Sequence, residues 1–167
     1  MDFLQSLSLS KFMPAQLAGD LSFLLIFVAV SLVAGMYLGR TQLVAVVMFN
    51  YIDVALITVL PSSIFAAVPY GRAGVFLAIF AIIFIVGDYV LDIHISSSGS
   101  DFFWRVLIMS FLAIGMLTSI VFSFLPMSDL MKFLSKSSLD YFISPNAQMA
   151  WMITPLIFLL FVNKRLR

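Results

Sequence analysis

The chain has 167 residues, of which 63% are hydrophobic and only 10% are charged, and its net charge is +1. A soluble globular domain carries about a quarter charged residues, so this composition excludes a water-soluble domain and indicates a protein that lies in a lipid bilayer. The lysines and arginines form no basic stripe, which argues against nucleic-acid binding, and the absence of cysteine excludes disulfides, thiolate metal sites and cysteine nucleophiles.

Residues 1–20 mix apolar side chains with serine, glutamine and Lys11, and Pro14 interrupts the pattern. A weakly amphipathic segment ahead of an apolar run is typical of a helix that lies in the membrane interface. A cleaved signal peptide is the alternative, but its apolar core would be about 7–15 residues, shorter than the run that follows. We therefore expect residues 1–20 to form an interfacial segment.

Two apolar runs follow, at residues 21–39 and 41–60, and each is close to the roughly 20 residues that a helix needs to cross a bilayer. Almost no linker separates them, so we expect a tight hairpin that turns at Gly39 and Arg40. Pro61 closes the second run. The sequence therefore predicts a first helical hairpin inside the bilayer.

Two further apolar runs, at residues 74–91 and 104–125, predict a third and a fourth span. An arginine precedes and a proline follows both the second and the fourth spans at equal spacing, with Arg105 and Pro126 enclosing the fourth. This spacing favours two tandem helical hairpins, an arrangement common among transporters. The alternative is a chance likeness, because helices built from few apolar residue types resemble one another.

The C-terminal part begins with residues 127–140, where Lys132 and Lys136 lie away from the leucines of an amphipathic pattern, as in an interfacial helix. The last apolar run, residues 147–162, is shorter, contains Pro155 and is a marginal fifth span. The predicted fold is an all-α, polytopic transmembrane helical bundle of about five spans that forms one membrane domain. Lysine and arginine divide almost evenly between its two sides, so the positive-inside rule assigns no orientation.

Asp53 is a candidate functional residue, because an ionised carboxylate within a membrane span costs about a few kcal/mol unless it finds a partner or water. Asn50 stands three residues earlier and so lies on the same helical face. One helical turn thus presents an amide and a carboxylate, which together are a candidate proton or cation site. The alternative is that Asp53 pairs with Arg72, or with a polar group on a neighbouring helix, and only locks the bundle.

Ser31, Gly35 and Gly39 recur every four residues in the first predicted span and form a ridge of small side chains. Such a ridge lets the backbone of another helix approach closely. Its partner is either the second span of the hairpin or a helix of another subunit, and the sequence does not choose between the two.

The loop between the third and fourth predicted spans concentrates polar residues. We expect Asp88 and Arg105 to form an ion pair that closes the two helix ends. Asp92 and His94 also lie there, but one histidine among aspartates is typical of a solvated loop, so we predict no metal site and no cofactor. The single histidine and the absence of phosphate-binding glycine motifs argue against an enzyme.

Asp20 before the first predicted span, the turn at Gly39 and the amphipathic segment ahead of the last span resemble the colicin V production (CvpA-like) family of small bacterial inner-membrane proteins. The resemblance covers roughly residues 20–60. Thr41 and Gln42 stand where the family usually has an acidic residue, which is a departure from its pattern. The resemblance implies a protein of the bacterial cytoplasmic membrane that is tied to export or envelope homeostasis.

Together these features predict a non-enzymatic membrane subunit or scaffold that packs against partner membrane proteins or against further copies of itself. The small-residue ridge, the short loops and the scarcity of polar groups within the spans favour this hypothesis. The alternative is a small transporter or channel with a proton or cation site at Asn50 and Asp53. Both hypotheses have the lipid bilayer as a partner, and neither involves nucleic acid.

Overall fold

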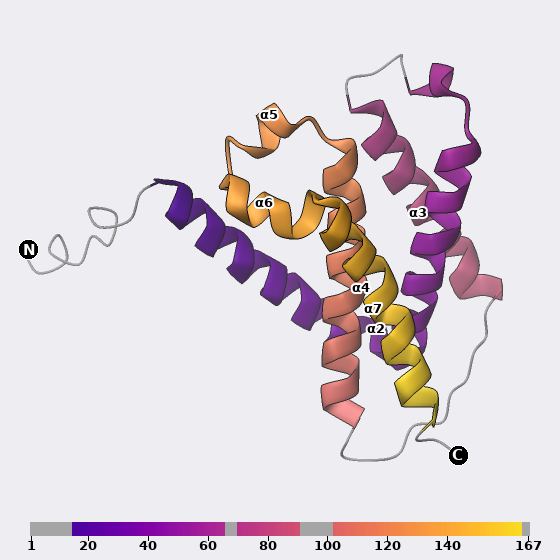
Figure 1. The fold of residues 1–167 in the computed structure, drawn as a ribbon. Coiled ribbons are helices and arrows are strands. Elements are labelled where there is room, and N and C mark those ends of the chain that lie inside the picture. The colour runs from indigo at the N-terminus through magenta and orange to yellow at the C-terminus, as the bar shows by residue number, and fades with distance from the viewer. Residues whose placement is uncertain (1–14, 66–69, 91–101, 165–167) are drawn as a thin grey trace, which may run out of the picture.

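The computed structural model describes residues 15–65, 70–90 and 102–164, with side chains described for all of these except 15–17, 39–41, 88–90, 102–103 and 162–164. Its helices are α2 (Ala15–Val59), the short 3-10 helix η2 (Ser62–Ile64), α3 (Gly71–Val90), α4 (Phe102–Phe124), α5 (Met127–Leu130), α6 (Lys136–Ile143) and α7 (Pro145–Lys164). These ranges contain no strand, and the helices form a bundle (Figure 1). The predicted all-α class is therefore confirmed.

Three stretches of helix are long and apolar enough to cross a membrane: Ala18–Leu38, Gln42–Val59 and Trp104–Phe124. A fourth is added if α6 and α7, which meet at a bend of 50°, count as one broken span. α3 is also apolar, and the part of it whose side chains are described, Gly71–Gly87, is shorter than these three stretches. The described part of the chain thus has three to four candidate spans, whereas the sequence predicted about five.

The expected hairpin between the first two spans is wrong in its detail, because α2 runs as one helix from Ala15 to Val59. The two halves of α2 nevertheless run in different directions: the indigo first half projects from the body, while the second half lies within it (Figure 1). No proline separates the halves, and the arginine, threonine and glutamine that follow Gly39 all tolerate a helical backbone. The chain therefore stays helical where we expected a turn.

The two segments predicted to lie in the membrane interface contain helix where the structure describes them, and their place in the interface stays a prediction. Residues 15–20 form the start of α2, and residues 1–14 lie outside the described part of the chain. The segment 127–140 is not one helix, since it contains α5 and the start of α6. Ser135 separates the two by capping α6, where its side chain accepts a hydrogen bond from the Ser138 N–H at 3.2 Å.

α4 lies at the centre of the bundle, where it contacts α2, α3, α6 and α7. Half of its span is buried, the largest share among the three candidate spans. The main core consists of aliphatic, methionine and phenylalanine side chains, namely Leu43, Val46, Val47, Ile57, Phe76, Val106, Met109, Ala113, Met116 and Ile120. The other long helices are therefore arranged around α4.

The described helices pack as one bundle rather than as two tandem hairpins. α3 lies mainly against the second half of α2, where a Cβ added to Gly87 would lie 2.1 Å from the Phe49 ring. The small residues of α4 face other helices, since Gly115 lies under the Trp151 ring of α7 and Ser110 faces the first half of α2. These close approaches join α4 to α2 and α7 more extensively than to α3.

Pro145 breaks the helix between α6 and α7. Because proline has no N–H, the carbonyl of Tyr141 one turn earlier loses its helical partner, and the Trp151 indole N–H donates to this carbonyl at 2.9 Å. The next carbonyl, that of Phe142, accepts a hydrogen bond from the Ser119 hydroxyl of α4 at 2.6 Å. Side chains of α7 and α4 thus satisfy the backbone carbonyls at the break.

Candidate functional site

Asn50 and Asp53 lie in the second half of α2, and both are 0% exposed. They belong to a stripe of buried residues that includes Val46 and Ile57 at helical spacing. The apolar members of this stripe form part of the main core. The helical register of α2 therefore carries these two side chains, hereafter the polar pair, into the interior of the bundle.

The polar pair has no hydrogen-bond partner in the described part of the chain, neither at the Asp53 carboxylate oxygens nor at the Asn50 amide. The other buried polar side chains differ, because the hydroxyls of Ser31, Ser110 and Ser119 donate to backbone carbonyls at 2.8, 2.9 and 2.6 Å. Leaving a buried polar group unpaired costs about 1–3 kcal/mol, and more if it is charged. The polar pair is therefore the energetically costly feature of the described core.

Arg72 does not pair with Asp53, although the sequence offered that ion pair as the alternative. Its guanidinium lies instead over two aromatic rings, 5.6 Å from the centroid of Phe65 and 5.7 Å from that of Phe124. Cation–π attraction holds the arginine in this position, in the first turn of α3. Asp53 thus has no cationic partner within the described residues.

The residues next to the polar pair on α2 contact two other helices. On one side, the Phe49 ring lies against Gly87 of α3. On the other side, the Tyr51 hydroxyl donates a hydrogen bond to the backbone carbonyl of Met152 in α7. The polar pair projects between these two directions, because successive helical residues are about 100° apart. Protein on both sides therefore separates the pair from the bilayer.

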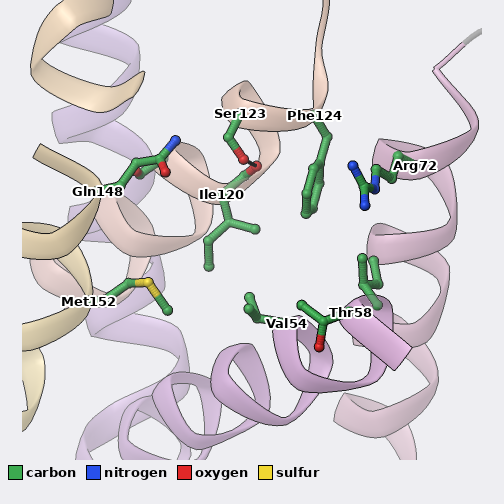
Figure 2. Close-up of a pocket in the computed structure, with 10 residues that line it drawn as sticks. Val54, Thr58, Arg72, Ile120, Ser123, Phe124, Gln148 and Met152 are labelled. Carbon is green, nitrogen blue, oxygen red and sulfur yellow. Dashed lines mark hydrogen bonds between the residues drawn. The ribbon is translucent and has the colours of Figure 1, made fainter. Parts of the chain in front are cut away.

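A cavity of about 180 Å³ lies beside this part of α2 (Figure 2). Its wall is formed by Val54, Ile57, Thr58, Arg72, Ser119, Ile120, Ser123, Phe124, Gln148 and Met152. Val54 and Ile57 follow Asp53 along α2, but Asp53 itself does not line the cavity. This space, hereafter the helix-end cavity, is thus distinct from the polar pair and was not foreseen from the sequence.

Of the predicted small-residue ridge, Gly35 lies against α4 of the same chain and Ser31 is buried. A Cβ added to Gly35 would lie 2.9 Å from the Ser110 Oγ and 3.6 Å from the Val106 Cγ1, and Ser31 is only 2% exposed. The surroundings of Gly39 lie outside the described residues. At Gly35 the ridge therefore packs on α4, which is neither of the two partners that we expected.

The expected ion pair between Asp88 and Arg105 stays a prediction, because the Asp88 side chain lies outside the described residues. Arg105 is partly buried in the first turn of α4. Asp92 and His94 also lie outside the described part of the chain. Within that part, no three His, Cys, Asp or Glu side chains are grouped so that they could hold a metal ion.

A polar cluster on the surface joins α5 to the start of α3. The Tyr70 hydroxyl donates to Asp129 Oδ2 at 2.5 Å, and Lys132 Nζ donates to Asp129 Oδ1 at 2.5 Å. The hydrogen bond from Lys132, and then that from Tyr70, holds the pKa of Asp129 below its usual value. The sequence analysis did not predict this cluster. The i,i+3 spacing of Asp129 and Lys132 is visible in the sequence, but nothing in the sequence indicates that Tyr70, 59 residues before Asp129, lies beside them.

Comparison of the chain with protein-family models, with curated proteins and with solved structures finds no match. The polar pair and the helix-end cavity are the two features of the described bundle that packing alone does not explain.

Proposed function

We propose that the chain is a small multi-pass membrane transporter whose proton or small-cation site is the polar pair of Asn50 and Asp53. The observation that supports this proposal is the complete burial of both side chains without a hydrogen-bond partner in the described chain. A bound proton or cation would replace the missing partner of the carboxylate. The Asn50 amide oxygen would be the second ligand, one helical turn away.

Transport requires that the polar pair meets water from each side of the membrane in turn. In the described bundle the pair is enclosed, so a neighbouring helix has to move. α7 is suited to this role, because Pro145 breaks it from α6 and Pro155 interrupts its own hydrogen bonding. The hydrogen bond between Tyr51 and the Met152 carbonyl, one turn before Pro155, would couple that bend to α2.

The experiment that tests the proposal measures cation flux in proteoliposomes with Asp53→Asn. We expect the wild-type protein to dissipate an imposed proton or sodium gradient, and the variant to lose this flux because its amide has no charge to bind either ion. A pH-sensitive dye inside the vesicles and radioactive sodium uptake report the two ions separately. Size-exclusion elution in detergent checks that the variant still assembles.

Asp129→Asn is the matched control, because it removes a carboxylate from the surface cluster rather than from the core. We expect this variant to keep the wild-type flux. A wild-type protein whose vesicles leak no faster than empty vesicles, or an Asp53→Asn variant with unchanged flux, would contradict the proposal.

A second candidate is a non-enzymatic subunit or scaffold, the function that the sequence favoured. The first half of α2 supports it, because only 17% of Ala18–Leu38 is buried. Its outward face carries Leu25, Ile26 and Val33, which are 63%, 63% and 64% exposed. The small-residue ridge no longer supports this candidate, since Gly35 faces α4 and Ser31 is buried within the chain.

Crosslinking distinguishes a partner on this face from lipid. The chain has no natural cysteine, so Val33→Cys introduces one reactive site on the outward face of α2. If a second copy packs there, oxidation in the membrane should yield covalent dimers. Ile82→Cys is the control, since Ile82 is 61% exposed on α3. Equal dimer yields from the two positions, or none from Val33→Cys, would argue that lipid covers the face.

We further propose that the protein resides in the bacterial cytoplasmic membrane, on the basis of its resemblance to the CvpA-like family. The apolar helices support membrane residence, and the family resemblance supplies the compartment. Separation of inner from outer membranes by density, followed by detection of the tagged protein, tests this assignment. Recovery in the outer-membrane fraction would contradict it.

A further inference from the structure

The helix-end cavity lies where four helices begin or end. Its wall takes Thr58 from the last turn of α2, Arg72 from the first turn of α3, Ser123 from the last turn of α4 and Gln148 from the first turn of α7. The ends of membrane-spanning helices lie at the level of the lipid headgroups. Two of the four helices, α2 and α4, end candidate spans at this cavity, so its Thr58 and Ser123 side lies at headgroup depth rather than in the middle of the bilayer.

The wall of the cavity changes from polar to apolar with depth. Val54, Ile120 and Met152 line it about one turn further into the bundle, on the same three helices that supply polar groups at the end. Figure 2 shows Val54 and Met152 on the side of the cavity opposite Ser123. The cavity thus has a polar rim and an apolar floor, which together are complementary to a ligand with a polar and an apolar part.

Arg72 supplies an uncompensated positive charge at this rim. It makes no ion pair or hydrogen bond with any described residue. Its guanidinium is held by the Phe65 and Phe124 rings, 5.6 and 5.7 Å from their centroids, and stays exposed. Figure 2 shows it directed toward Phe124 at the edge of the cavity. A fixed arginine fork is suited to bind phosphate oxygens.

We propose that the helix-end cavity binds one molecule of an anionic phospholipid, with its phosphate at Arg72 and the first methylene groups of one acyl chain against the apolar floor. The volume of about 180 Å³ is below the roughly 300–1,000 Å³ typical of pockets that enclose a whole small ligand, so only part of the lipid enters. The Gln148 amide, which makes no side-chain hydrogen bond to the described residues, donates to a headgroup or ester oxygen from the rim.

Native mass spectrometry of the full chain in detergent, titrated with phosphatidylglycerol or phosphatidylcholine, tests the proposal. We expect the wild-type protein to bind one phosphatidylglycerol about tenfold more tightly than phosphatidylcholine. Arg72→Gln should abolish that preference, because it removes the charge-assisted contact. Arg105→Gln, at the start of α4, is the matched control and should keep it. Arg72 is exposed, so its replacement leaves the core intact.

Val54→Phe tests the acyl-chain part of the site, because it fills the floor while Arg72 stays in place. We expect it to weaken phosphatidylglycerol binding about tenfold, whereas glycerol phosphate, which has no acyl chain, should not compete in the wild type. The proposal is overturned if the lipid preference survives Arg72→Gln, if Arg105→Gln removes it equally, if Val54→Phe binds as the wild type does, or if glycerol phosphate displaces the lipid.

Discussion

The two halves of α2 are similar in composition but differ in their place in the bundle. The first, Ala18–Leu38, is the more apolar, with a mean hydropathy of 2.4, and only 17% of it is buried. The second, Gln42–Val59, has a mean hydropathy of 1.9, contains the polar pair and is 39% buried. In water the more apolar half would lie inside. In a bilayer the order reverses, because lipid solvates apolar side chains while polar groups need protein around them.

The outward half of α2 is held by one face, whose Phe27 ring contacts α4, α6 and α7. Phe27 lies at 5.0 Å from the Phe111 ring, measured between centroids, and Gly35 faces Ser110. Near the start of the helix, the Asp20 carboxylate accepts a hydrogen bond from the Ser135 N–H at 2.8 Å. The inward half also packs against α3, through Phe49 and Gly87, and a larger share of it is buried, so substitutions in the two halves should have different consequences.

The largest difference is expected between Leu43→Ala and Leu25→Ala, since Leu43 is 0% exposed in the inward half and Leu25 is 63% exposed in the outward half. Removing a buried leucine leaves a cavity and costs about 2–5 kcal/mol. We expect the lower end of this range, because lipid solvates the side chain after unfolding. Leu25→Ala should change the free energy of unfolding little. Titration with sodium dodecyl sulfate in mixed micelles measures the free energy of unfolding of both variants. Equal losses would contradict the expected difference between the two halves of α2.

Asp53→Leu should stabilise the protein by about 1–3 kcal/mol, because it removes a buried carboxylate that has no partner in the described chain. The same titration with sodium dodecyl sulfate measures the change. Asp129→Leu, which removes a hydrogen-bonded surface carboxylate, should give no such gain. A destabilised Asp53→Leu variant would mean that the carboxylate has a structural partner. Burial of Asp53 would then not cost the free energy of an unpaired polar group.

Gly35→Ala should destabilise the packed face of the outward half by about 1 kcal/mol, because the added Cβ would lie 2.9 Å from the Ser110 Oγ. Gly74→Ala on α3 is the control, since a Cβ there has nothing within 4 Å. That variant should gain up to about 1 kcal/mol from helix propensity alone. Adding Ser110→Gly should relieve the crowding in the Gly35→Ala background. Additive effects in this double-mutant cycle would show that this face is not tightly packed.

The smallest effect is expected outside both halves, at the surface cluster. The pKa of Asp129 is lowered from 3.8, first by Lys132 and then by Tyr70, so its contribution to stability is present at neutral pH and is lost as the pH falls through the folded-state pKa. Solvent screening keeps this contribution small. We expect Lys132→Gln to lower the unfolding midpoint slightly at pH 7 but not at strongly acidic pH. A difference that grows on acidification would contradict this linkage.

The extent of α4 was anticipated from single residues. The fourth apolar run predicted residues 104–125, and α4 spans Phe102–Phe124, because Pro126 cannot continue the helix. The expected turn after Gly39 was wrong, since one glycine tolerates a helical backbone and does not impose a turn. The interruption at Pro145, which has no N–H to donate, was not singled out in the sequence.

The sequence by itself determined that this protein is helical and apolar, because composition and the spacing of prolines act locally. Only the tertiary structure decided which helices pack against each other. It packs Gly35 of the small-residue ridge on α4, places Arg72 between aromatic rings instead of beside Asp53, and leaves the polar pair enclosed without a partner. The reason is physical: helices of similar hydropathy are interchangeable to a bilayer, and only close side-chain fit between distant segments distinguishes them.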